Sequence, residues 1–211
     1  MKYGEKHSSN RRTDVIALGL TGGIGAGKST ALSMFRKMGA LVVSADQIVH
    51  ELYEQPSYIE QLVARFGIDI KDEQGGIKRQ YLAQKVKNRR EELRWLEQLT
   101  HPLVKQEISD AIARAAVGKI VVCEVPLLFE AHMEHLFALI INIEAEQIKR
   151  ATRSAERFDP KVFEEFDALQ TSSEQRTAGS DMTFYNNGSF VDMSGFVQEV
   201  YKRAEHLLEH Q

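Results

Sequence analysis

A glycine-rich segment near the start of the chain constrains the fold more than any other feature. A short apolar run, residues 15–20, leads into residues 22–29, which fit the pattern G-x-x-x-x-G-K-[ST]. A continuous apolar run of this kind is typical of a strand that is buried on both faces of a parallel sheet. Residues 29–38 then repeat apolar side chains at helical spacing, and Gly39 supplies a helix stop. A strand, a glycine-rich turn and a helix in this order predict a phosphate-binding loop.

The residue types in this loop suit the phosphates of a nucleoside triphosphate. Glycines let the backbone bend with its N–H groups pointing inward, and the N-terminus of the following helix adds a favourable dipole. Lys28 should neutralise charge on the β- and γ-phosphates, and the Ser29 hydroxyl should ligate Mg²⁺. The alternative is a glycine-rich turn with an incidental lysine. The predicted nucleotide-binding set is Gly23, Ile24, Gly25, Ala26, Gly27, Lys28, Ser29 and Thr30.

Apolar runs and helical patterns alternate along the rest of the chain. Further strands are expected at residues 41–43, 119–125, 136–143 and 182–185. Between them, residues 59–66 and 79–99 have helical spacing, and another helix is expected to begin at His101 and Pro102, because proline suits the first turn. A last helix should span residues 190–210. This alternation predicts an α/β fold of three layers around a central five-stranded parallel sheet, with right-handed crossovers.

The lengths of the connections predict how the domain is organised. We expect a flexible extension at residues 1–14 and a single domain over residues 15–211. Residues 47–117 are too long for a simple crossover and predict a helical subdomain that covers the substrate. Residues 145–176 are charged and helical, with an interruption at 158–160, as expected of a mobile lid.

Composition excludes several classes of protein. The formal net charge is −3 and the isoelectric point is near 6.2, so there is no basic excess to suggest nucleic-acid binding. Apolar stretches such as residues 137–141 are far shorter than the roughly 18 residues of a membrane span. The polar residues 1–14 do not resemble a secretory signal. Cys123 is the single cysteine and lies in an apolar run, which favours a buried structural thiol. These features predict a cytoplasmic protein.

Other motifs narrow the range of phosphate-loop proteins to one class of enzyme. A guanine-specific Asn-Lys-x-Asp motif is absent from the sequence, and Asp46 follows the second expected strand, where small phosphate-loop kinases place an acidic residue. The segments 20–30, 45–46, 99–104, 125–130 and 186–188 resemble, in this order, the motifs of the dephospho-CoA kinase family. Their sequences are LTGGIGAGKST, AD, LTHPLV, VPLLFE and NNG. The resemblance extends from about Ile16 to Gly188.

The resemblance implies a reaction and its cofactor. A member of this family transfers the γ-phosphate of ATP to the ribose 3′-hydroxyl of dephospho-CoA, which yields CoA and ADP in the last step of coenzyme A biosynthesis. It implies Mg²⁺ as cofactor, ATP and dephospho-CoA as partners, no nucleic acid or membrane partner, and a monomer or weak homo-oligomer. The chain departs from the family at Ser44 and Glu124, where the family commonly has Asp, and in the lid, where its pattern at residues 157–176 is altered.

Two carboxylates are expected to take part in the chemistry. By resemblance, Asp46 orients and deprotonates the acceptor hydroxyl; the alternative is an N-cap for a helix that begins near Gln47. Glu124 ends the strand beside the phosphate-loop strand, where its carboxylate could reach Mg²⁺ through water, and the alternative is a paired structural acid.

Arg150, Arg153 and Arg157 lie at i, i+3 and i+7, so one helical face could present three guanidinium groups to phosphates. Arg153 and Arg157 are therefore catalytic candidates. The alternative is a solvated face that pairs with Glu146 and Glu156.

By resemblance, Arg79 and His101 contact the acceptor and Asn186 meets the adenine of ATP. A capping role for His101 and a turn role for Asn186 remain alternatives. His132 and His135 have a spacing that could suit a metal, or they belong to a polar helix start.

Two other functions are consistent with the residues alone. One is a kinase for a nucleotide or a small metabolite on the same scaffold. The other is a nucleotide-dependent regulatory module that has lost transfer activity.

Overall fold

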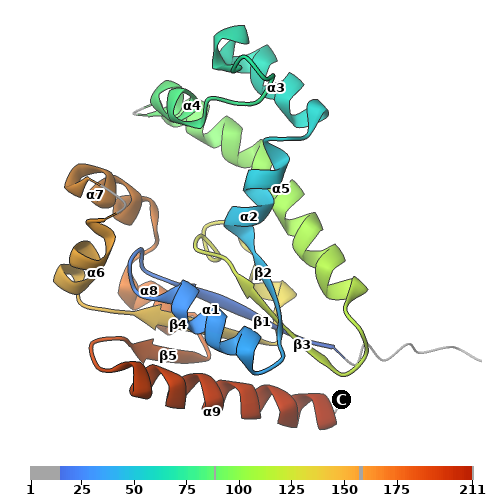
Figure 1. Cartoon of the computed structure of the whole chain (residues 1–211), viewed down its shortest axis with the longest axis vertical. Helices are drawn as coiled ribbons and strands as arrows, with labels where there is room; N and C mark the ends of the chain where they lie inside the picture. The colour runs from blue at the N-terminus through green and yellow to red at the C-terminus, as the bar shows by residue number, and fades with distance from the viewer. Residues whose placement is uncertain (1–14, 88, 157–158, 211) are drawn as a thin grey trace, which may run out of the picture.

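A computed structural model describes residues 15–87, 89–156 and 159–210 (Figure 1). At its centre lies a sheet in which all neighbouring strands are parallel, in the order β2-β3-β1-β4-β5. The strands are β1 Val15–Gly22, β2 Leu41–Ser44, β3 Lys119–Glu124, β4 Leu139–Glu144 and β5 Met182–Tyr185. The predicted α/β fold with a five-stranded parallel sheet is confirmed.

Alternation along the central strand distributes its side chains between two cores. Ile16, Leu18 and Leu20 are fully buried against α1 Lys28–Lys37 and α9 Phe190–Glu209, which cover one face of the sheet. Gly19 points to the other face, where a Cβ atom would lie 2.7 Å from Phe137 Cδ2. The second face therefore packs directly onto the backbone of β1.

An arm of helices stands on this second face (Figure 1). It consists of α2 Ala45–Leu52, α3 Pro56–Phe66, η1 Ile68–Ile70, α4 Arg79–Val86 and α5 Arg90–Arg114. Its buried side chains, such as Leu62 and Ile108, form one cluster with Val121 and Cys123 of β3. The arm therefore shares its core with the sheet.

The expected boundary at His101 and Pro102 is wrong. α5 continues through Pro102, although proline has no N–H to donate to the carbonyl of Gln98. Thr100 donates to the Leu96 carbonyl (2.7 Å) and lies 2.7 Å from the Tyr58 hydroxyl. Partly buried residues before the proline, such as Leu99, and buried residues after it, such as Val104, pack on the same core, so tertiary packing overrides the local preference.

The fourth strand begins later than expected. Residues 134–136 form the short helix η2 Glu134–Leu136, and β4 starts at Leu139. Leu136 and Phe137 pack against the core beneath the arm and so do not pair along β1.

The region after β4 folds into α6 Gln147–Ser154, α7 Pro160–Leu169 and α8 Ser173–Ala178. In Figure 1, α6 and α7 stand on the side of the sheet opposite α5. Asp159 caps α7 by accepting a bond from the Lys161 N–H, and Pro160 occupies its first turn.

No helix in the described ranges is long and apolar enough to cross a membrane. Cys123 is fully buried, as predicted, and burial raises the pKa of its thiol to about 12.

Candidate active site

The loop between β1 and α1 has the conformation that its glycines were predicted to allow. Gly22, Gly25 and Gly27 have φ values of 140°, 73° and 109°, which are costly for residues with a side chain. At Gly22 a Cβ atom would also lie 2.0 Å from the Ile143 carbonyl oxygen. The loop bends into the start of α1, whose first N–H groups have no partner within the helix. These groups can bind an anion.

A cavity of about 700 Å³ opens beside this loop. The loop and the start of α1 contribute Ile24, Gly25, Gly27, Lys28, Ser29 and Thr30 to its lining. The first turn of α2 contributes Asp46, and the end of β3 with the turn after it contributes Glu124, Pro126 and Leu127. The lid contributes Arg153, Ser154, Phe166, Leu169 and Gln170. Most of the predicted nucleotide-binding set and both predicted carboxylates therefore face one space.

Lys28 lies at the floor of this cavity with its charge largely buried. Its Nζ atom donates to the carbonyl oxygens of Gly22 (2.9 Å) and Gly23 (3.1 Å). Burial lowers the pKa of Lys28, while the nearby Glu124 and Asp46 carboxylates act to raise it. An anionic phosphate in the cavity would supply further compensating charge for this ammonium group.

Asp46 is exposed in the first turn of α2, the first helix of the arm, and it lines the cavity. α2 begins at Ala45 with Ser44 in the N-cap position, so the alternative of Asp46 as an N-cap near Gln47 is wrong.

Glu124 ends β3 and lies opposite Leu20 in the sheet. Burial raises the pKa of its carboxyl group, Lys28 lowers it, and Asp46 raises it. Ser29, Asp46 and Glu124 thus bring hydroxyl and carboxylate oxygens to one cavity. These are the ligand types that Mg²⁺ prefers, so the residues present fit that ion.

Of the three lid arginines, Arg150 and Arg153 lie in α6 and have different partners. α6 ends at Ser154, and Arg157 lies outside the described residues. Arg150 is buried and forms an ion pair with Asp167 (Nη1 to Oδ1, 2.5 Å), so its predicted role on a phosphate-clamping face and its alternative pairing with Glu146 are both wrong. Arg153 does line the cavity, and its Nη2 donates to the Asn186 carbonyl (3.0 Å).

Asn186 supports the phosphate loop from behind. Its Nδ2 donates to the Ala26 carbonyl (2.7 Å), and a Cβ atom on Gly27 would lie 2.6 Å from the same nitrogen. Asn186, Gly23 and Ala26 are not among the residues that line the cavity.

The two predicted acceptor ligands of the arm lie away from the cavity lining. Arg79 borders a separate hollow of about 480 Å³ together with Lys78, Gln80, Tyr81 and Gln84. Its Nη2 lies 3.3 Å from His50 Nε2, and its guanidinium lies over the Tyr53 ring at 5.3 Å. His101 is half-buried inside α5, so it caps no helix; burial lowers its pKa, against the opposing effect of Glu97 and Glu130.

Glu130 binds the segment between α7 and α8. Its Oε1 accepts from the N–H and the hydroxyl of Thr171. His132 has a φ of 51° in the turn that follows. No group of three or more His, Cys, Asp or Glu side chains placed for a metal occurs in the described ranges.

Sequence reasoning missed the role of Gln170, which lies within the altered lid pattern at residues 157–176. The side chain accepts from the Ile24 N–H (2.9 Å) and donates to the carbonyls of Gly22 (3.2 Å) and Pro126 (2.9 Å). Its contacts join segments more than forty residues apart, so only its place in the lid pattern could have singled it out.

Comparisons with known proteins agree with this geometry. A family model described as dephospho-CoA kinase matches residues 16–192. The dephospho-CoA kinase of Thermobifida fusca is 31% identical over 198 residues, which cover 92% of this chain and 98% of that one. The dephospho-CoA kinase of Mycobacterium tuberculosis is 34% identical over 193 residues, 89% of this chain, but this chain spans only 47% of that relative. A crystal structure from Thermus thermophilus has a TM-score of 0.75 at 25% identity, covering 89% of this chain and 97% of that one. The chain therefore belongs to the dephospho-CoA kinase family.

Proposed function

We propose that the chain transfers the γ-phosphate of ATP to the ribose 3′-hydroxyl of dephospho-CoA, which yields CoA and ADP in the last step of coenzyme A biosynthesis. One observation carries the proposal: Lys28 and Ser29 of the phosphate loop and Asp46 of the arm line a single cavity. Donor and acceptor can therefore meet in one cavity, and phosphoryl transfer depends chiefly on such positioning.

The donor half of the reaction belongs to residues 23–30. The bent loop and the first turn of α1 receive the β- and γ-phosphates, and Lys28 leaves the Gly22 and Gly23 carbonyls to neutralise their charge. Ser29, with Glu124 through a water molecule, would hold Mg²⁺, which offsets negative charge on the phosphates when bound. Asn186 supports the loop at Ala26 and borders the region where we place the adenine.

The acceptor half belongs to the arm, which begins with α2. Asp46 accepts a hydrogen bond from the ribose 3′-hydroxyl and directs that oxygen toward the γ-phosphate, and it takes the proton during transfer. Arg79 and His101 are the proposed contacts for the rest of dephospho-CoA, brought closer when the arm and the lid close over the substrates.

The lid, residues 145–176, supplies positive charge to the phosphates. Arg153 already lines the cavity, and it approaches the phosphates when it releases the Asn186 carbonyl. Arg157 is proposed as a second cation for the same charge. We place the protein in the cytoplasm as a monomer or weak homo-oligomer, without nucleic acid or membrane partners.

ADP release by the purified protein with Mg·ATP tests this function. Dephospho-CoA is compared with a panel of nucleoside monophosphates and adenosine, and the product is identified by mass. Stimulation by dephospho-CoA alone, with CoA as product, is expected. Stimulation by a different acceptor would replace the substrate and keep the kinase, and ATP binding without any turnover would favour a regulatory module.

A further inference from the structure

The carboxamide of Gln170 connects three segments that meet at the phosphate loop. Gln170 follows the last residue of α7, and its side chain reaches the loop at Ile24, the end of β1 at Gly22 and the turn after β3 at Pro126. Both N–H bonds of the amide and one lone pair of its oxygen are used. The side chain thus fixes the end of α7 to the floor of the site.

Ile24 is held by the lid on both sides of its backbone. Gln170 accepts from its N–H at 2.9 Å, and Arg150 Nη1 donates to its carbonyl at 3.4 Å. The same Arg150 nitrogen pairs with Asp167 at 2.5 Å, which connects α6 to α7. The Ile24 N–H is only partly buried, but losing the Gln170 acceptor would still cost its hydrogen bond, so the loop and the two lid helices are coupled at this residue.

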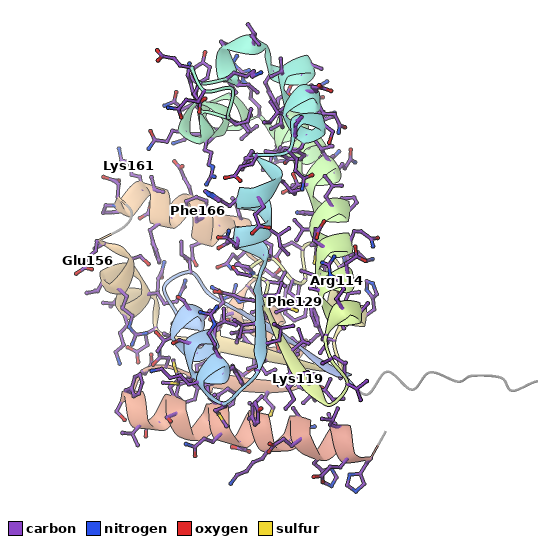
Figure 2. All side chains as sticks on the ribbon, turned by 45° about the vertical axis from the view of Figure 1, so that its right-hand side comes forward. Arg114, Lys119, Phe129, Glu156, Lys161 and Phe166 are labelled. Carbon is purple, nitrogen blue, oxygen red and sulfur yellow. The ribbon has the colours of Figure 1, made fainter. Side chains whose placement is uncertain are left out.

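Phe166 and Leu169 line the cavity from the same helix that Gln170 ends. In Figure 2, Phe166 and Lys161 are labelled on α7, with Lys161 toward the end that lies farther from the arm. A shift of α7 relative to the loop would therefore move one wall of the cavity against the phosphates.

From these contacts we propose that Gln170 is a positioning residue for phosphoryl transfer, which keeps the lid helix α7 in register with the phosphate loop. The proposal rests on the proposed kinase function for its kinetic consequence. Gln170 acts through Ile24 and α7, while Lys28 and the first turn of α1 bind the nucleotide. Loss of Gln170 should therefore impair transfer far more than ATP binding.

The three contacts specify glutamine at this position. A glutamate keeps an acceptor for the Ile24 N–H but cannot donate to the Gly22 and Pro126 carbonyls, and its second oxygen would face them. A methionine keeps the volume and loses all three bonds. Gln170→Met and Gln170→Glu therefore test the same role by different means, so failure of one variant to fold leaves the other.

The kinetic test compares kcat with the Kd of a non-hydrolysable ATP analogue. Gln170→Met is expected to lower kcat about ten- to hundredfold and to change that Kd by less than about threefold. Gln147→Met, an exposed glutamine in the lid helix α6, is the matched control and should behave as wild type. A kcat within about twofold of wild type, or an equal loss in kcat and in ATP binding, would overturn the proposal.

Hydrogen exchange of the α7 amides tests whether Gln170 holds α7 to the phosphate loop. This measurement does not depend on which substrate accepts the phosphate. Both Gln170 variants should exchange about tenfold faster across residues 160–169, and Gln147→Met should not. If the wild-type protein gave no turnover with dephospho-CoA, the proposed function would fail while this measurement still decided the role of Gln170. Unchanged exchange in α7 would show that Gln170 does not hold α7 to the loop, whatever substrate the protein phosphorylates.

Discussion

The ion pair between Arg176 on α8 and Glu144 at the end of β4 is the most deeply buried charge pair among the described residues. Arg176 Nε and Nη2 donate to the two Glu144 oxygens at 2.7 Å and 3.0 Å, and the side chains are 3% and 2% exposed. Arg176 Nη1 also donates to the Thr171 carbonyl, one residue beyond Gln170. Arg176→Met therefore leaves a carboxylate buried without its counter-charge.

The expected loss follows from this burial. Breaking a buried pair by removing one partner typically costs about 3–5 kcal/mol, because the remaining charge stays desolvated. For a chain of 211 residues, each kcal/mol lowers Tm by about 2–4 °C, so the Tm of Arg176→Met should fall by about 6–20 °C. The double variant Arg176→Met, Glu144→Leu removes the stranded charge and should recover most of this loss.

Thermal and urea unfolding of the variants measure the effect. Arg114→Met is the matched control: it removes the pair with Glu107, in which the side chains are 69% and 46% exposed, and it should cost less than about 1 kcal/mol. If Arg176→Met cost no more than Arg114→Met, or if the double variant were no more stable than the single one, the stranded-charge reasoning would be refuted.

Two further predictions concern the site, and a third concerns the buried Cys123. Lys28→Ala should lower the rate of ADP release by at least about a hundredfold while the far-UV spectrum stays native, since the side chain neutralises phosphate charge; near-normal turnover would remove Lys28 from this role. Asp46→Asn should lower kcat about a hundredfold or more but change binding of an ATP analogue by less than about threefold, and matching losses would indicate a structural residue. Because burial raises the pKa of Cys123 to about 12, its thiol stays protonated at pH 8. A thiol reagent should therefore label it only in the unfolded protein, and rapid labelling of the native protein would contradict this.

Local sequence patterns were sufficient to predict the sheet and the loop. Ile16, Leu18 and Leu20 alternate with residues such as Ala17 and Gly19, which tolerate a packed second face, and glycines occupy the positions of the loop where φ is positive. Strand and loop are specified by neighbours in the chain, so their prediction needs no knowledge of distant contacts.

Prediction was less successful where distant packing decides the outcome. Pro102 favours a helix start locally, yet residues on both sides of it pack against the arm core and α5 continues. The spacing of Arg150 suits a phosphate-binding face, but its guanidinium forms an ion pair with Asp167 on the next helix. In both cases a tertiary contact outweighs a local preference worth only a few kcal/mol.

The sequence by itself determined the strand–loop–helix unit that surrounds Lys28, the parallel sheet and the family, because each depends on residue types at fixed, short spacing. Only the tertiary structure decided which polar side chains meet at that unit. Gln170 reaches Ile24 across 146 positions, and Asn186 reaches Ala26 across 160. A hydrogen bond needs its two groups about 3 Å apart, and that distance is set by how the helices pack on the sheet.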